Sequence, residues 1–228
     1  MDNETREVLV TFLQGREYLF SLLHRLLGAE PEKELLDAVS SENSLQTVLL
    51  FDSEDSKAAR QLYKILQSCS FTEPEHIQQM KDEYTRLFIG PDRLFAAPWE
   101  SVYTTKERAL FQQSTLGARS WYKKYHYLPE KYPRVADDHI SLMMHFLSLT
   151  CTKAAACLND DNLNECWNIL ADQKAFETEH LLNWIFLYAE DIQASKSRKF
   201  YPQFVKAAAD FIRYDNQIID ELMDNLKL

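Results

Sequence analysis

The 228-residue chain is long enough for one large helical domain or two small ones, and its apolar fraction of 46% is typical of a protein with a buried core. It carries 25 Lys and Arg against 35 Asp and Glu, a formal net charge of −10. Such a surface repels phosphate backbones, so we expect no nucleic-acid partner. Solubility is the simplest role for this charge, and attraction of a basic ligand is the alternative.

The sequence shows no sign of membrane insertion, export or a disulfide framework. No stretch approaches the roughly 20 apolar residues of a membrane span. The acidic start MDNETREVLV lacks the basic region and apolar core of a signal peptide. The four cysteines, at positions 69, 151, 157 and 166, include no Cys-x-x-Cys pair. We therefore expect a cytoplasmic protein without an integral membrane segment, with reduced and mostly buried thiols.

Apolar residues recur at helical spacing along most of the chain, while only four Gly and seven Pro leave few tight turns. The expected helices cover residues 4–27, 31–39, 44–51, 56–69, 72–88, 104–124, 136–157, 173–192 and 202–226. Two of them, over 72–88 and 104–124, begin at sequences typical of a capping box. No repeat or shift in composition divides the chain. The sequence therefore predicts one all-α domain over residues 1–228.

A segment rich in aromatic residues interrupts this helical pattern. Residues 84–103 read YTRLFIGPDRLFAAPWESVY, with Gly90, Pro91 and Pro98 as helix breakers. A loop with so many large apolar side chains is more than a solvated connection. Those side chains must pack against the domain's own helices or against a ligand, and the residues alone leave both alternatives open.

A second irregular connection, over residues 125–133, precedes Asp138 and His139 at the start of the central helix. Asp138 would lie near the positive end of that helix, where negative charge is stabilised. His139 would face the apolar side of the helix. A capping Asp beside a half-buried His is the simpler interpretation of this dipeptide, and a recognition site is the alternative.

The chain carries no complete signature of an enzyme. Its glycines form neither a phosphate-binding loop nor a dinucleotide fingerprint, and no Gly-x-Ser-x-Gly elbow occurs. Glu177 and His180 have the Glu-x-x-His spacing of di-iron bundles, so a helical metalloenzyme that uses them is one alternative. Such a site also needs a lone Glu from each of two other helices, and nothing singles these out. We therefore expect no metal, no cofactor and no catalysis.

The motifs at residues 84–103 and 135–140 resemble those of the TorD/DmsD family, cytoplasmic chaperones of molybdenum-containing oxidoreductases. The family's first pattern is close to Tyr-x-x-Leu-Phe-x-Gly-Pro followed by Pro-Pro-Trp-x-Ser-x-Tyr/Trp, and its second is Glu-Pro-x-Asp-His. The matching residues are Tyr84, Leu87, Phe88, Gly90, Pro91, Pro98, Trp99, Ser101, Tyr103, Asp138 and His139. Ala97 replaces the first Pro of the Pro-Pro pair, and Ala136-Asp137 replaces Glu-Pro, so the match does not imply a particular client.

The resemblance implies an all-α fold and binding of the twin-arginine signal peptide of a molybdoenzyme precursor until its cofactor is inserted. A leader with a basic start and an apolar segment would need an acidic rim and an apolar groove. The candidate peptide-binding residues are Tyr84, Leu87, Phe88, Leu94, Phe95, Pro98, Trp99, Asp138 and His139. Asp138 would accept hydrogen bonds from arginine or from peptide amides. The alternative is the related NarJ-like branch, which serves a membrane-bound nitrate reductase; either protein could be a monomer or a homodimer.

Overall fold

The computed structural model describes residues 1–54, 56–70, 73–90, 94–106, 108–129, 135–195, 197 and 199–226. Every regular element in these ranges is a helix, so the predicted all-α fold is confirmed. The helices are α1 Asn3–Gly28, α2 Lys33–Val39, α3 Glu42–Leu49, α4 Ala58–Gln67, α5 Pro74–Tyr84, η1 Thr85–Ile89, α6 Glu100–Thr104, α7 Gln113–Lys124, α8 Ile140–Asn159, α9 Leu163–His180, α10 Ile185–Ala194 and α11 Phe200–Leu226.

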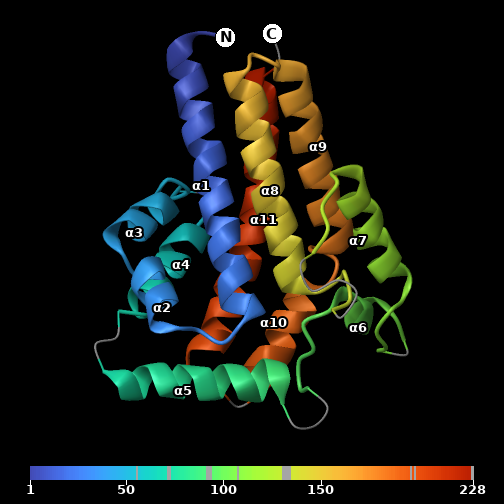
Figure 1. Ribbon diagram of the computed structural model, residues 1–228. Helices are drawn as coiled ribbons and strands as arrows, with labels where there is room; N and C mark the ends of the chain where they lie inside the picture. The colour runs from blue at the N-terminus through green and yellow to red at the C-terminus, as the bar shows by residue number, and fades with distance from the viewer. Residues whose placement is uncertain are drawn as a thin grey trace.

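The long helices α1, α8, α9 and α11 run side by side and form the body of the molecule (Figure 1). The short helices α2, α3 and α4 cover one side of α1, and α5 lies across the end of the bundle where α1 ends and α8 begins (Figure 1). In α1, buried leucines such as Leu9, Leu13 and Leu23 recur at helical spacing and face the bundle. One cluster of buried apolar side chains extends from Leu9 to Leu226.

The central helix α8 has the length and mean hydropathy, 1.3, of a possible membrane span, and within the described ranges it is alone in this. The expectation that no stretch has such a composition was therefore too strong. However, 61% of that stretch is buried inside the protein, because α8 packs between α1 and α9. Burial in the bundle accounts for its apolar character. The cysteines follow the same pattern, because all four are free thiols and three of them are buried.

Several helix boundaries differ from the prediction: α8 begins at Ile140 instead of residue 136, and α9 begins at Leu163 instead of residue 173. The helix expected over residues 173–192 is divided, because α9 ends at His180 and a turn over residues 181–184 leads into α10. The helix expected to start at residue 104 starts at Gln113 instead. Arg108 and Phe111, with φ of 45° and 60°, have left-handed backbones that a right-handed helix cannot contain. The expected capping boxes include Thr72 and Glu107, which lie outside the described residues.

The helix expected over residues 72–88 continues as predicted, but its last turn widens. After α5 the chain forms the π-helical turn η1, in which the Gly90 N–H donates to the Thr85 carbonyl at 2.7 Å. Gly90 has a φ of 53°, a conformation that costs glycine little and ends the helix. The helix that begins with α5 therefore ends at Gly90.

Candidate functional site

The two sequence motifs meet at an isolated antiparallel bridge between Trp99 and His139. The Glu100 N–H donates to the Asp138 carbonyl at 3.1 Å, and the Ile140 N–H donates to the Pro98 carbonyl at 3.0 Å. The indole and imidazole rings of the bridge lie edge to face, with centroids 5.0 Å apart. The aromatic segment and the start of α8 are therefore held together by main-chain hydrogen bonds and by a ring contact.

Asp138 lies beneath this bridge and is fully buried. Its Oδ2 accepts a hydrogen bond from the Ser101 N–H at 2.8 Å, and its Oδ1 accepts one from the Thr115 hydroxyl at 2.9 Å. Asp138 therefore caps the first turn of α6 and holds α7 through the hydrogen bond from Thr115, instead of capping α8. The cap of α8 is His139, whose Nδ1 accepts from the Ser141 N–H at 3.1 Å. Because the Asp138 carboxylate has no exposed surface, it stabilises the bridge from inside the protein.

The candidate residues at the end of α5 and in η1 are also buried. Tyr84, Leu87 and Phe88 are 5%, 3% and 8% exposed, and Pro98 is buried as well. The rings of Tyr84 and Phe88 pack against Tyr201 of α11, with centroid separations of 5.6 and 5.0 Å. Of the two alternatives that the sequence left open, packing against the domain's own helices applies to these residues.

The other candidates of the aromatic segment reach the surface. Phe95 is 60% exposed, and Leu94 and Trp99 are partly exposed. They line a cavity of about 560 Å³ together with Leu110 and the Arg108–Asp191 ion pair, whose N–O distance is 2.8 Å. This bridge-side cavity offers an apolar surface with one charged pair at its edge.

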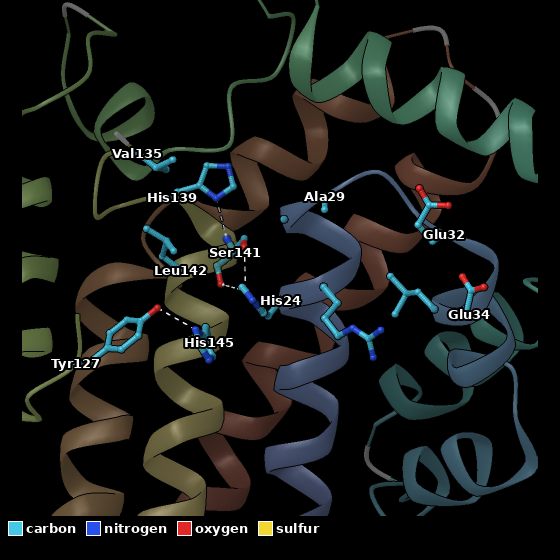
Figure 2. Close-up of a pocket in the computed structure, with 13 residues that line it drawn as sticks. His24, Ala29, Glu32, Glu34, Tyr127, Val135, His139, Ser141, Leu142 and His145 are labelled. Atoms are coloured by element: carbon cyan, nitrogen blue, oxygen red, sulfur yellow. Dashed lines mark hydrogen bonds between the residues drawn. The ribbon is translucent and has the colours of Figure 1, made fainter. Parts of the chain in front are cut away.

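A second cavity, of about 400 Å³, lies between the end of α1, α2 and the start of α8 (Figure 2). We call it the leader cavity, because His139, a residue that the sequence predicts to bind a leader peptide, lines it. Its apolar lining includes Leu35, Val135 and Leu142, and His139 connects it to the Trp99 bridge. Glu32 and Glu34 stand on the α2 side, away from the imidazoles (Figure 2). Arg25 also lines the cavity, so its charge is mixed, with two carboxylates against one guanidinium.

Two imidazoles form the inner wall of the leader cavity (Figure 2). The rings of His24 and His145 stack with centroids 4.5 Å apart and an angle of 17° between their planes. His24 Nδ1 lies 2.8 Å from the Ser141 carbonyl, which can only accept, so this nitrogen carries the proton. His145 Nδ1 lies 3.0 Å from the Tyr127 hydroxyl. Burial, and then the neighbouring His24, lower the pKa of His145, so the neutral form is favoured.

Sequence reasoning missed most of the leader cavity. Glu32, Glu34, His24, Tyr127 and His145 come from four separate segments, and no local motif marks any of them. Only the fold brings them to His139. The family resemblance implied an acidic rim for a basic leader, but the sequence did not indicate that Glu32 and Glu34, at the start of α2, would line this cavity.

The alternative metal site is not assembled, because Glu177 and His180 face different partners. Glu177 is fully buried beside Arg16, which donates to Asp215 through Nε and Nη2 at 2.8 Å each. Burial, and then the Asp215 charge, raise the pKa of Glu177 well above its usual value. His180 Nδ1 instead lies 2.9 Å from Glu100 Oε2. In the part of the chain that the structure describes, no three His, Cys, Asp or Glu gather as a metal site.

Similarity to known proteins extends over most of the chain. Residues 51–190, more than half of it, match the family model described as nitrate reductase delta subunit. The Salmonella typhimurium Tat proofreading chaperone DmsD is 28% identical over 171 residues, which cover 72% of this chain and 74% of that protein. A Haemophilus influenzae protein assigned the same name is 26% identical over 124 residues, and the chain spans about half, 54%, of its length. A solved structure from Archaeoglobus fulgidus, a candidate redox enzyme maturation protein, has a TM-score of 0.51 at 22% identity and covers 87% of this chain and 93% of that one.

Proposed function

The chain belongs to the nitrate reductase delta subunit family, and we propose that it is a chaperone for the twin-arginine signal peptide of a molybdenum-containing oxidoreductase. In this role it holds the precursor in the cytoplasm until the molybdenum cofactor is inserted, and it catalyses no reaction itself. The sequence motifs and the relatives named as Tat proofreading chaperones support this proposal.

One observation carries the proposal: two carboxylates, Glu32 and Glu34, line an apolar cavity that also contains His139 of the bridge between the two motifs. Glu32 and Glu34 can pair with the guanidinium groups of a leader, because carboxylates accept two parallel hydrogen bonds from arginine. Leu35 and Leu142 can receive the apolar residues that follow. Glu32 already pairs with Lys81 at 2.7 Å, but such an exposed pair is worth at most about 1 kcal/mol and can be displaced.

The nine candidate residues divide into two roles under this proposal. Leu94, Phe95, Trp99 and His139 have exposed surface and would touch the peptide. The remaining five are buried and would hold that surface in place: Tyr84, Leu87, Phe88, Pro98 and Asp138. Trp99 lines one cavity and His139 lines the other, and the two residues are paired in the bridge, so an extended peptide could cross the bridge from one cavity to the other.

The test is a calorimetric titration with a twin-arginine leader peptide. Glu32→Lys/Glu34→Lys should weaken binding at least about tenfold, because it replaces two attractive charges with repulsive ones. Glu4→Lys/Glu7→Lys makes the same change in net charge at the opposite, exposed end of α1 and serves as the control. Wild-type binding should weaken with salt without vanishing, because the apolar contacts are not screened. Equal losses in both variants would show that the rim has no specific role.

A second candidate function is assembly of a membrane-bound nitrate reductase whose catalytic subunit carries no leader. The description of the matching family model favours it. The same calorimeter separates the two functions. A peptide from the amino terminus of such a subunit, without paired arginines, should bind more weakly than a twin-arginine leader if the first function holds, and more tightly if the second does.

A further inference from the structure

A third cavity, of about 430 Å³, lies between α4, α5 and the start of α11. We call it the basic cavity. Its size is within the range of small-molecule sites. Ile65, Met80 and Phe200 give it apolar walls, and its polar rim carries Lys64, His76, Lys199, Gln79, Gln203 and Ser68. The proposal made from this cavity does not depend on the function proposed above.

The basic cavity is separated from the leader cavity by α5. His76, Met80 and Glu83 recur at helical spacing on one face of α5 and line the basic cavity. Lys81 lies on the opposite face and reaches Glu32 at the rim of the leader cavity. The two cavities are therefore distinct, and a ligand in one does not touch the other.

Charge distinguishes the basic cavity from the rest of this acidic chain. Lys64 and Lys199 form no ion pair with the described residues, unlike Lys81 and Lys206, which pair with Glu32 and Asp210. They extend from different elements, α4 and the residue before α11, and meet at one opening. Two ammonium groups that converge without a carboxylate attract an anion.

The single carboxylate in the lining does not cancel this charge. Glu83 is 2% exposed and accepts hydrogen bonds from the Ser197 hydroxyl, the Phe200 N–H at 3.0 Å and the Tyr201 N–H at 3.3 Å. It therefore caps the first turn of α11, where its charge is compensated by the helix dipole. A ligand at the rim meets lysines and amides, with Glu83 turned to the protein.

We propose that the basic cavity binds a small amphipathic carboxylate, with its head between Lys64 and Lys199 and its apolar body against Ile65, Met80 and Phe200. An ammonium group forms short, charge-assisted hydrogen bonds with a carboxylate. The Phe200 ring is fixed in the wall, because it stacks on Phe204 with centroids 5.1 Å apart and an angle of 16°. An unbranched aliphatic chain is the simplest body that can contact these three apolar side chains.

Calorimetry of the full chain with sodium decanoate, below its micellar concentration, tests this proposal. Decanoate should bind with one-to-one stoichiometry. Acetate supplies only the head and decanol only the body, so each should bind at least about tenfold more weakly. Decanol binding as tightly as decanoate, or no binding of decanoate at all, would overturn the proposal.

Charge reversal locates the site. Lys64→Glu/Lys199→Glu should weaken decanoate binding at least about tenfold, and both side chains are exposed, so the fold should remain intact by circular dichroism. Lys123→Glu/Lys206→Glu makes the same change in net charge on exposed residues outside the cavity and should leave the affinity unchanged. Equal affinity in the two variants would refute the assignment. Leader affinity, measured in parallel, should differ little between the two variants, so failure of either proposal is recognised separately.

Discussion

Replacement of Asp138 tests whether this buried carboxylate stabilises the candidate site. The carboxylate accepts one hydrogen bond from the Ser101 N–H and one from the Thr115 hydroxyl, and it has no exposed surface. Asp138→Ala removes both acceptors and leaves two buried donors without partners. Asp138→Asn keeps one oxygen acceptor but turns an amide toward the other donor.

The expected loss in the free energy of unfolding follows from these two hydrogen bonds. A hydrogen bond to a charged group contributes about 1.5–3 kcal/mol, so the loss of two predicts that Asp138→Ala is destabilised by about 3–6 kcal/mol. Asp138→Asn should lose roughly half of that. An exposed helix cap, which is what the sequence alone suggests, would cost only about 1–2 kcal/mol. Stability therefore distinguishes a buried support from a surface cap.

The assay is guanidinium unfolding of each variant beside a leader titration. Asp37→Ala is the control, because that carboxylate is exposed and its pair with Lys33 should change the free energy of unfolding by less than about 1 kcal/mol. Leader binding should weaken in proportion to the loss of structure around Trp99. If Asp138→Ala kept its full stability and lost leader binding, Asp138 would touch the peptide and the reasoning would be wrong.

Three further changes test the packing, the surface and the histidines. Phe95→Ala should change the free energy of unfolding by less than about 0.5 kcal/mol, because the residue is 60% exposed, yet weaken leader binding in calorimetry. Gly117→Ala should destabilise by about 1–3 kcal/mol in guanidinium, because its Cβ would lie 2.6 Å from His180 Cε1; an unchanged midpoint would contradict this contact. Burial and His24 lower the pKa of His145, so the stability given by its neutral form is present above the unfolded pKa of about 6.5 and is lost as the pH falls through the lowered value. The unfolding midpoint of His145→Gln should therefore fall less than that of wild type between about pH 7 and about pH 5, and an equal fall would refute the assignment.

Two of the long amphipathic helices, α1 and α11, could be predicted closely from sequence, because a stripe of apolar residues over many turns specifies both the type and the extent of a helix. The helices expected over residues 4–27 and 202–226 correspond to α1 Asn3–Gly28 and α11 Phe200–Leu226. The break after α9 could not be predicted from sequence, because residues 181–184 contain neither Gly nor Pro. It depends on tertiary packing: Trp184 is 1% exposed, and its indole N–H donates to the His180 carbonyl at 2.6 Å.

The aromatic segment shows a different limit. Its composition predicted that the large side chains would pack on something, but two phenylalanines seven positions apart have opposite environments, with Phe88 at 8% exposure and Phe95 at 60%. Residue type cannot make that distinction, because Phe88 packs against Tyr201 within η1, while Phe95 lies after the end of that helix and lines a surface cavity. The leader cavity could not be predicted from sequence either, since the turn between α1 and α2 is what brings Glu32 and Glu34 to it.

The buried polar groups explain how a short bridge can hold a defined surface. Glu100 follows Trp99 directly, is 2% exposed, and bonds to His180 at 2.9 Å and to Asn183 at 3.2 Å. Asp138 precedes His139 directly and binds α6 and α7. Each half of the bridge is thus adjacent to a buried carboxylate that is hydrogen-bonded to other elements of the fold, so neither ring needs a ligand to fix its position. Because ordering a flexible surface on binding costs free energy, a bridge fixed in advance lets more of the contact energy with a peptide appear as affinity.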